Sequence, residues 1–373
     1  MPRPLHATVF PSALAHNVAT VRRCLAQAAE PGASLPRVWA VIKANAYGHG
    51  IERMLPGASS ADGLAMLDLE EAVRCREAGW AGPVMLLEGF FEPADLAVLE
   101  RYRLCAVVHD ASQLDMIRSI RPRQPLDIYL KLNTGMNRLG FAPGRYRAAY
   151  DEALALRAQG LLGSIGHATH FASGDSPEHV THVAGIFDRA TLDMPGARSL
   201  CNSAAIFGSP AFAARTDWVR PGICLYGATP FDDGAVSAQA LGLRPAMALR
   251  STLIAEQHVQ AGGGVGYGAR FVADRPTRVG IVACGYADGY PRHAPTGTPV
   301  VVHGVRTRLV GRVSMDMLAV DLQPVPEAQV GSPVTLWGAD GLSVDEVAAA
   351  AGTIGYELLT AVTARVPMRT AQD

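Results

Sequence analysis

The sequence of 373 residues is long enough for two domains, or for one large barrel with an appended domain. Apolar residues make up 49% of the chain and charged residues 18%, so it can bury a large core, and general disorder is excluded. With 33 basic and 34 acidic residues the net charge is −1, which excludes an overall basic field for binding nucleic acid or an anionic membrane.

Short apolar runs of β-type alternate with helical patterns along the first two thirds of the chain. Strand followed by helix, repeated eight times, predicts parallel strands closed into a (β/α)8 barrel, which we place at residues 10–242. The eight predicted strands are Val38–Lys43, Leu64–Leu67, Val84–Leu87, Leu104–Val108, Leu126–Leu132, Leu161–His167, Arg198–Cys201 and Trp218–Gly222.

Two of the helices between these runs have clear sequence signals. Ser12–Ala29 precedes the first strand and carries an apolar stripe of Leu14, Val18, Val21 and Leu25 at helical spacing. Asp68–Gly79 opens on Asp68, a favoured N-cap residue, and closes on a glycine.

The pattern changes at about residue 243, where strand-like runs are joined by turns rich in glycine and proline. This predicts a mostly antiparallel β-domain over residues 243–373, to which residues 1–9 could contribute. Helices are expected at Ser343–Ala351 and Tyr356–Thr363. The predicted strands are Ala248–His258, Thr277–Cys284, Pro299–Val302, Arg306–Val310, Met317–Leu322 and Pro333–Trp337.

Only two of the 33 basic residues are lysines, and both stand at the ends of predicted strands. Lys43 ends the first strand of the barrel, and Lys131 lies near the end of the fifth. The carboxyl ends of barrel strands build the active site, and partial burial lowers the pKa of a lysine there. Lys43 is therefore a candidate Schiff-base former or general base; the alternative is a lysine that merely ends a strand.

Polar residues also follow the last two strands of the barrel. Asn202 and Ser203 come after the seventh strand, and Arg220, Gly222 and Ile223 lie at the end of the eighth. Loops at these places often bind phosphate through backbone N–H groups and a hydroxyl. Asn202 and Ser203 also fit a simple helix N-cap, and the two interpretations are compatible.

Two further segments carry weaker signals. The glycine-rich GGGVGYGARF at Gly262–Phe271 matches neither a P-loop nor a dinucleotide fingerprint, so it is either a hairpin tip or a loop that presents Tyr267 to a site. The spacing of His167, His170, His179 and His182 resembles that of metal ligands. His167 and His170, however, lie at the end of a predicted strand, where residues three apart point to opposite faces. We therefore predict no metal site.

Nine motifs, in order and nearly from end to end, resemble the alanine racemase family of fold-type III pyridoxal-phosphate enzymes. Their spacing is also that of the family, whose fold is an N-terminal barrel followed by a β-domain. The motifs are VIKANAYGHG, KLNTGMNRLGF, THFA, NSAA, VRPGICLYG, GVGYGARF, GYADGYPR, GRVSMDM and TIGYE.

The resemblance implies a role for individual positions. Lys43 would hold pyridoxal 5'-phosphate and act on one face of the substrate, and Tyr267 of the partner subunit would act on the other. Arg220 would face the pyridine nitrogen, with His170 between it and the tyrosine. Tyr47, Ser203, Gly222, Ile223 and Tyr356 match the phosphate-binding positions; Arg138, Met315 and Asp316 match the substrate-binding set; and Asp175, Tyr286, Arg292, Arg312 and Ile354 match the entry corridor.

Racemisation has to remove a proton from one face of Cα and return one to the other, so two acid–base groups are needed. The resemblance therefore implies a homodimer that shares its active sites and interconverts L- and D-alanine. At Lys131 some family members carry an N-carboxylated lysine that orients the arginine equivalent to Arg138. A bare ammonium at Lys131 would repel Arg138, so we expect carbamylation.

Other interpretations and the location of the protein follow from the remaining features. A fold-type III decarboxylase usually has an acidic residue where Arg220 stands, and a lone-barrel cofactor-binding protein would lack Tyr267. For a metal-dependent aldolase of the same fold, only Cys284 and His293 could suggest a metal site.

The six cysteines form no C-x-x-C pair and the N-terminus lacks the apolar segment of a secretory signal, so we expect a cytoplasmic enzyme with no membrane or nucleic-acid partner. Met368 departs from the family, which usually has arginine directly after this proline.

Overall fold

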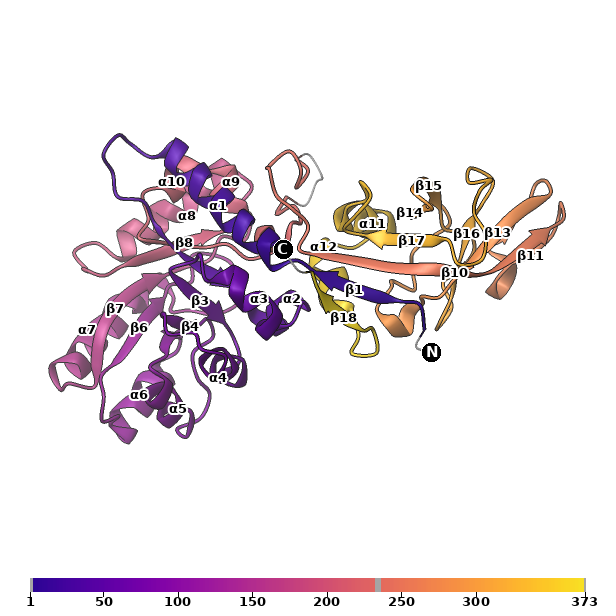
Figure 1. Cartoon of the computed structure of the whole chain (residues 1–373). Helices are drawn as coiled ribbons and strands as arrows, with labels where there is room; N and C mark the ends of the chain where they lie inside the picture. Colours follow the sequence, from indigo (N-terminus) through magenta and orange to yellow (C-terminus); the bar gives the residue numbers. More distant parts are fainter. Residues whose placement is uncertain (1–2, 232–235, 372–373) are drawn as a thin grey trace. The chain divides into compact units, whose positions relative to one another are not determined.

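The computed structural model describes residues 3–231 and 236–371 (Figure 1). The chain forms two compact units, and we describe each by itself. The barrel unit comprises Ala15–Ala46 and Gly50–Leu225, and the β unit comprises the described residues of Met1–Leu14, Tyr47–His49 and Tyr226–Asp373.

Eight parallel strands close into a barrel, which confirms the predicted fold class. Each strand pairs with the next, and β9 closes the ring on β2 with Arg37 opposite Trp218 and Val38 opposite Val219. The strands are β2 (Arg37–Val41), β3 (Gly63–Met66), β4 (Val84–Leu86), β5 (Cys105–Val108), β6 (Leu126–Lys131), β7 (Leu162–Ala168), β8 (Arg198–Asn202) and β9 (Trp218–Arg220). Each overlaps one of the eight predicted runs.

Four helices of the barrel unit, α4, α6, α8 and α9, begin after a residue whose side chain accepts a hydrogen bond from their first amide groups. Asp68 accepts hydrogen bonds from the amides of Glu70 and Glu71 at 2.7 and 3.4 Å, as its predicted role as N-cap requires. The helices are α1 (Pro11–Ala28), α3 (Ile51–Ala58), α4 (Leu69–Glu77), α5 (Asp95–Tyr102), α6 (Ala111–Ile120), α7 (Pro143–Ala158), α8 (Pro177–Ala190), α9 (Ser203–Gly208) and α10 (Pro210–Ala213), with the 3-10 turn η1 (Ile223–Tyr226). The stripe predicted for the first helix is fully buried along α1.

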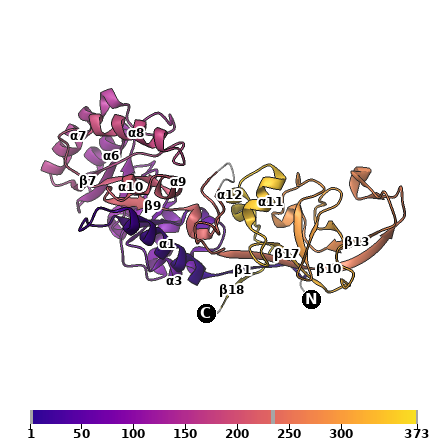
Figure 2. The ribbon, with the colours of Figure 1, turned by 90° about the horizontal axis from the view of Figure 1, so that it is seen from above.

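The β unit is built on the long strand β10 (Met247–Val259), which lies in one sheet of order β15-β14-β17-β10-β1-β18 and pairs antiparallel with β17, β1 and β13 (Figure 2). The other strands of this sheet are β1 (His6–Val9), β13 (Thr277–Val282), β14 (Pro299–Val302), β15 (Val305–Arg308), β16 (Leu318–Asp321), β17 (Pro333–Trp337) and β18 (Met368–Thr370). Two helices, α11 (Val344–Ala351) and α12 (Gly355–Ala361), complete the unit where helices were predicted.

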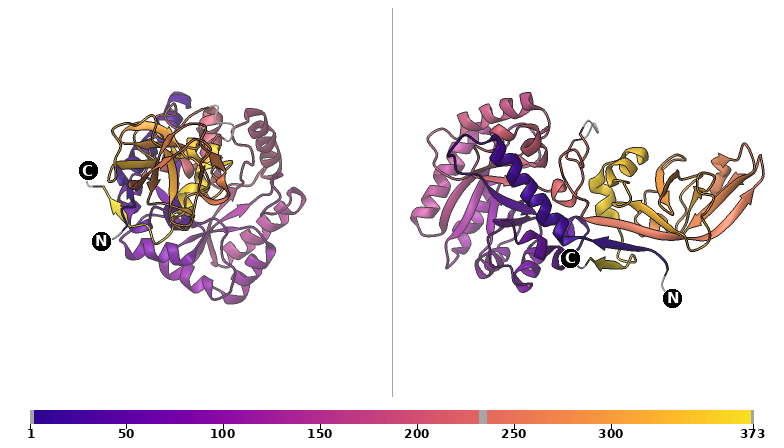
Figure 3. Two further views of the ribbon diagram at one scale, coloured as in Figure 1. Left: turned by 90° about the vertical axis from the view of Figure 1, so that its right-hand side faces the viewer. Right: turned by 45° about the horizontal axis from the view of Figure 1, so that its top comes forward.

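The two ends of the chain meet in this sheet. β1 pairs antiparallel with β10 and parallel with β18, with Ala7 opposite Met368, and then leads into α1 (Figure 3, right). Neither β1 nor β18 was predicted as a strand, because each has only three or four residues and takes its hydrogen bonds from segments far away in the sequence. Among the described residues, none of the helices is both long and apolar enough to cross a membrane.

Candidate active site at the carboxyl ends of the barrel strands

Lys43 lies two residues beyond β2, at the start of a turn with an unusual backbone. Ala44, Asn45, Ala46 and Tyr47 have φ angles of 53°, 52°, 55° and 51°, and so form a left-handed turn (α2, Lys43–Tyr47). Such angles cost roughly 1–2 kcal/mol for each residue with a side chain. Neighbouring side chains hold this strained turn in place.

Those side chains come from the helix after the next strand. The Glu71 carboxylate of α4 accepts a hydrogen bond from the Asn45 amide at 2.5 Å. The Asn45 side-chain oxygen accepts from Arg74 at 3.0 Å and from the Ile51 amide at 3.2 Å. Burial raises the pKa of Glu71. Sequence reasoning missed Glu71, because nothing in the pattern of a surface helix says which of its acids turns inward.

Lys43 and four other cationic or titratable side chains form a cluster that we call the barrel mouth: Lys43, Lys131, Arg138, His170 and Arg220. Burial lowers the pKa of Lys43, and Arg138 lowers it further, against an opposing influence from Glu88. Burial, Arg220 and Arg138 lower the pKa of Lys131 to about 8. Both amines are therefore easier to deprotonate than an exposed lysine, as a base or a nucleophile requires.

Arg220 is the most enclosed cation of the barrel mouth. It ends β9 with 7% of its surface exposed and donates to the carbonyl oxygens of Thr169 at 2.6 Å, of Leu200 at 3.0 Å and of Ser199. One guanidinium nitrogen also lies 3.5 Å from His170 Nδ1. Burial lowers the pKa of Arg220 to about 10, which still leaves it charged at neutral pH.

His170 follows β7 and is kept neutral by its surroundings. Burial, then the charges of Arg220 and Arg138, hold its pKa well below the ordinary value. Its Nε2 lies 3.5 Å from the Asn202 side-chain nitrogen. Lys131, Arg138 and His170 line one small cavity, so the structure brings these three predicted residues together.

The predicted phosphate-binding residues of the barrel unit also meet. Ser203 is buried, and its hydroxyl accepts a hydrogen bond from the Gly222 amide at 2.8 Å. Ile223 begins η1 directly after Gly222. Asn202 caps α9 by accepting from the Ala205 amide at 3.0 Å, so the predicted N-cap is confirmed.

Two further predicted phosphate residues belong to the β unit. Tyr47 stacks on Tyr226 with ring centroids 4.5 Å apart and lies 6.2 Å from the ring of Tyr356 in α12. Tyr47 is buried and Tyr356 half-buried. The three aromatic rings form one group, which Gly48 allows because a Cβ there would lie 2.3 Å from the Leu359 carbonyl oxygen.

Most of the remaining predicted residues are exposed. Tyr267 sits in the 3-10 turn η2 (Tyr267–Ala269) at the tip of a hairpin of β11 (Gly264–Val265) and β12 (Phe271–Val272), with 72% of its surface exposed. Met315 and Ile354 are 52% and 48% exposed. Asp175, Tyr286, Arg292 and Asp316 are exposed or half-exposed, and Arg312 is half-buried.

The histidines of the weak metal pattern are placed apart. The buried His167 is hydrogen-bonded through Nδ1 to the Tyr146 hydroxyl at 2.9 Å and through Nε2 to the Met194 carbonyl oxygen at 3.0 Å. His170 belongs instead to the barrel mouth. In residues 3–231 and 236–371 we find no group of three or more histidine, cysteine or acidic side chains arranged to hold a metal.

The donor set of the barrel unit suits pyridoxal phosphate. A primary amine with a lowered pKa can bond an aldehyde carbon, and the hydroxyl of Ser203 with the amides of Gly222 and Ile223 can bind a phosphate. The charged Arg220 can donate to a ring nitrogen. The surplus of positive charge in the barrel mouth favours an anionic ligand.

Comparison with known proteins agrees with this chemistry. Residues 9–230 match the family described as "Alanine racemase, N-terminal domain", and residues 246–370 match "Alanine racemase, C-terminal domain". The chain is 61% identical to the alanine racemase of Bordetella petrii over 99% of both chains, and 59% identical to that of Bordetella avium over the full length of both. It superposes on the biosynthetic alanine racemase of Pseudomonas aeruginosa with a TM-score of 0.92 at 47% identity, covering 99% of this chain and 100% of that one.

Proposed function

The chain belongs to the alanine racemase family, whose pyridoxal-phosphate-dependent members interconvert L- and D-alanine, and we propose that it does so with Lys43 and the Tyr267 of a partner subunit. The observation that carries this proposal is Lys43 itself. It is one of only two amines on the side chains of the protein, it follows the first barrel strand, and burial lowers its pKa.

Lys43 has two tasks in this proposal. It holds the cofactor through its amine, and it then takes a proton from Cα of the substrate, or returns one, on one face. Bound pyridoxal phosphate supplies the electron sink that makes this proton acidic. The lowered pKa makes the Nζ atom easier to deprotonate than that of an exposed lysine, as its role as a base requires.

Tyr267 serves the opposite face. An ordinary tyrosine has a pKa of about 10, so its hydroxyl needs nearby positive charge to act as a base near neutral pH. Arg220 can supply this charge through His170, because the Arg220 guanidinium lies 3.5 Å from His170 Nδ1. Arg220 also stays protonated, so it would donate to the ring nitrogen of a bound cofactor and keep that nitrogen without a proton.

The remaining predicted residues bind the two ends of the reactants. Ser203, Gly222 and Ile223, with Tyr47 and Tyr356, bind the phosphate. Arg138, Met315 and Asp316 hold the substrate, and its carboxylate suits the Arg138 guanidinium. Asp175, Tyr286, Arg292, Arg312 and Ile354 line the path by which alanine enters.

We propose a homodimer because the β unit exposes the groups that the barrel of another subunit lacks. Tyr267, Tyr286, Met315 and Ile354 all leave at least a third of their surface exposed, so their side chains are available to a partner. A second copy of the chain supplies both the cover and the site that Tyr267 serves. Sedimentation at low micromolar concentration should give a dimer.

Lys131 is proposed to be carbamylated. Its pKa of about 8 leaves part of the amine neutral, as reaction with carbon dioxide requires. The carbamate would be an anion beside Arg138 and Arg220, where an ammonium is repelled. A high-resolution electron-density map or carbon-13 spectrum of the folded enzyme that shows a bare amine would remove this proposal.

We further propose that the enzyme acts in the cytoplasm and supplies D-alanine for peptidoglycan. The solved relative from Pseudomonas aeruginosa is a biosynthetic alanine racemase, which favours this role over D-alanine breakdown. A disruption of the gene that left cells dependent on added D-alanine would support the role, and a defect only in growth on D-alanine would favour breakdown.

The central test measures formation of D-alanine from L-alanine, with exchange of the α-hydrogen in deuterium oxide as a second readout. Lys43→Ala should lose the visible absorbance of the bound cofactor and all racemisation. Tyr267→Phe should keep the absorbance, lose about 10²–10⁴-fold in rate, and exchange the α-hydrogen of only one enantiomer. Tyr102→Phe on α5 is the matched control and should leave the rate unchanged.

Equal exchange of both enantiomers by Tyr267→Phe would contradict the two-base arrangement. A wild-type protein that binds the cofactor without forming D-alanine would contradict the proposed activity itself.

A further inference from the structure

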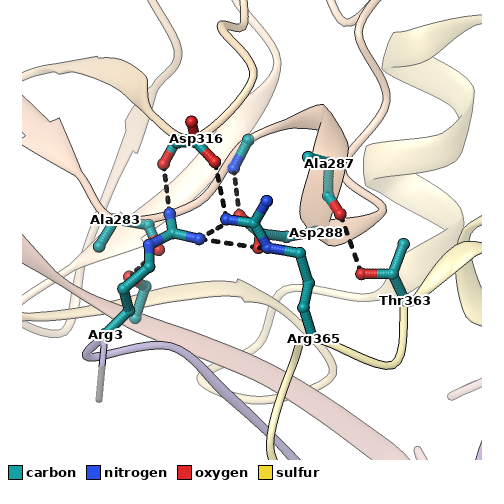
Figure 4. Close-up of polar contacts among 9 residues, drawn as sticks. Arg3, Ala283, Ala287, Asp288, Asp316, Thr363 and Arg365 are labelled. Carbon is teal, nitrogen blue, oxygen red and sulfur yellow. Dashed lines mark hydrogen bonds and ion pairs between the residues drawn. The ribbon is translucent and has the colours of Figure 1, made fainter.

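Two arginines from opposite ends of the chain converge on two aspartates of the β unit (Figure 4). We call Arg3, Arg365, Asp288 and Asp316 the arginine clasp. Arg3 donates to both carboxylate oxygens of Asp288, at 2.9 and 3.2 Å, and Arg365 Nε lies 2.9 Å from one of them. Arg365 also donates to the Asp316 carboxylate at 2.7 Å, and Arg3 donates to the Asp316 carbonyl oxygen at 2.5 Å.

The aspartates stand on two turns that touch through their backbones. The Tyr286 amide donates to the Ser314 carbonyl oxygen and the Ala287 amide to that of Met315, both at 3.0 Å. The approach is so close that a Cβ on Gly285 would lie 2.3 Å from the Met315 carbonyl oxygen. Only glycine fits there, so the two turns lie in direct backbone contact.

These turns carry residues of the proposed function but have little packing of their own. Met315 and Met317 are 52% and 44% exposed, and Tyr286 is 36% exposed. By contrast, the Asp288 side chain is 1% exposed and also accepts from the Gly285 amide at 2.9 Å. The buried carboxylate fixes one turn, and Arg365 ties the exposed turn to it.

We propose that Arg365, supported by Arg3, is a positioning residue that sets the place of Met315 and Asp316 for substrate binding. The inference rests on the proposed function of those two residues. The planar guanidinium of Arg365 contacts one carboxylate through Nε and the other through a terminal nitrogen, so it fixes a direction as well as a distance. Arg3 adds a hold on the backbone at Asp316.

The first test is the steady-state kinetics of the holoenzyme with Arg365→Met. Loss of the tie should raise the KM for alanine about 10-fold, because the substrate-binding turn loses its fixed position. The kcat should change less than about 3-fold, because Lys43 and the cofactor are untouched. Arg365→Lys should give an intermediate KM, since an ammonium can reach one carboxylate but not hold both in the guanidinium geometry.

Arg308→Met is the matched control. Arg308 belongs to the same unit, is half-exposed, and binds the carboxylate of Asp321, which is 8% exposed, at 3.1 Å. It should share any loss of melting temperature with Arg365→Met, but leave KM unchanged. An equal rise in KM for both variants, or no rise for Arg365→Met, would show a merely structural salt bridge and overturn the proposal.

Hydrogen exchange tests the same idea without catalysis. In Arg365→Met the amides of Tyr286 and Ala287 should exchange faster, whereas those of β10 should not; in Arg308→Met neither set should change. Unchanged exchange at Tyr286 and Ala287 would overturn the proposal. Should Arg365→Met not fold, Arg365→Lys carries both measurements. An inactive wild-type enzyme would count against the proposed function, whereas the exchange result would still decide the clasp.

A double-mutant cycle with Asp316→Asn tests whether Arg365 changes KM through the Asp316 side chain. If Arg365 acts through the Asp316 side chain, the Arg365→Met change should raise KM less in the Asp316→Asn background than in the wild type. Fully additive changes in KM would overturn this assignment.

Discussion

The barrel mouth and the arginine clasp both gather arginine side chains, but they balance the charge in different ways. In the clasp, two arginines face two aspartates, and the set is neutral. In the barrel mouth, Arg220 donates to carbonyl oxygens, and the neighbouring cations lower the pKa of Lys131. The charges of the clasp neutralise one another, whereas the positive charge of the barrel mouth is neutralised by an anionic ligand.

This difference separates positioning from chemistry. Charged groups that the protein does not neutralise keep shifted pKa values and are free to act on a ligand. Charged groups that pair within the protein stabilise a local geometry. Substitutions in the barrel mouth should therefore affect catalysis far more than stability, whereas substitutions in the clasp should affect substrate binding and stability together.

The largest expected effect is that of Arg220→Met. Loss of its charge should lower kcat/KM by about 10²–10³-fold, because a fixed charge at the reacting system is lost. The free energy of unfolding should fall by only about 1–3 kcal/mol, since the carbonyl groups of Thr169, Ser199 and Leu200 lose a donor while the cost of burying a charge disappears. Kinetics and urea unfolding of the same preparation give both numbers.

Arg37→Met at the other end of the barrel is the control for Arg220. Arg37 lies over the Trp218 ring at 4.1 Å and is exposed, so its loss should leave kcat/KM unchanged. Activity of Arg220→Met within about 3-fold of the wild type would break the distinction between the two regions.

The next effect concerns the turn that holds Lys43. Glu71→Ala removes the acceptor of the Asn45 amide and should lower kcat/KM about 10-fold, because the strained turn can relax and move the lysine. Glu70→Ala, one residue earlier on the exposed side of α4, should change neither activity nor cofactor release. Release of the cofactor from Glu71→Ala, followed by its absorbance, should be faster; release at the wild-type rate would show that the turn is held without Glu71.

The smallest effect is one of stability alone, at a buried carboxylate of the β unit. That carboxylate is Asp345, whose pKa burial and the neighbouring Glu346 raise from 3.8 to about 6. The Asp288 carboxylate, by contrast, is paired with two arginines. The folded state then binds more protons than the unfolded state between these values, so stability falls as the pH rises from about 4 to 6 and stays lower above it.

Asp345→Asn should therefore stabilise the protein at pH 8 by roughly 1–3 kcal/mol, and should change it little at pH 4. The amide oxygen can still accept from the Thr229 amide, which Asp345 does at 2.9 Å. Thermal unfolding at the two pH values measures the difference. A gain at pH 4 equal to that at pH 8 would contradict the assigned titration.

Sequence patterns predicted the barrel and placed Lys43 and Arg220 at its carboxyl end, whereas Arg138 and His170 were assigned from the resemblance to the family. Eight apolar runs separated by helical segments admit few arrangements other than a closed parallel barrel, because parallel strands need a crossover after each one. Positions directly after such strands must lie at one end of the barrel, so the order of residues along the chain is enough to assign Lys43, Asn202, Ser203 and Arg220 to one site.

Tertiary structure decided what depends on contacts between distant segments. β1 and β18 are too short to be recognised locally, and they exist because each finds hydrogen-bond partners from the other end of the chain. The left-handed turn after Lys43 runs against the backbone preference of Ala44, Ala46 and Tyr47, and it persists because Glu71 binds it. The clasp joins residues up to 313 positions apart. Periodicity and spacing reveal local structure, whereas the pairing of distant charges depends on how the finished fold brings them together.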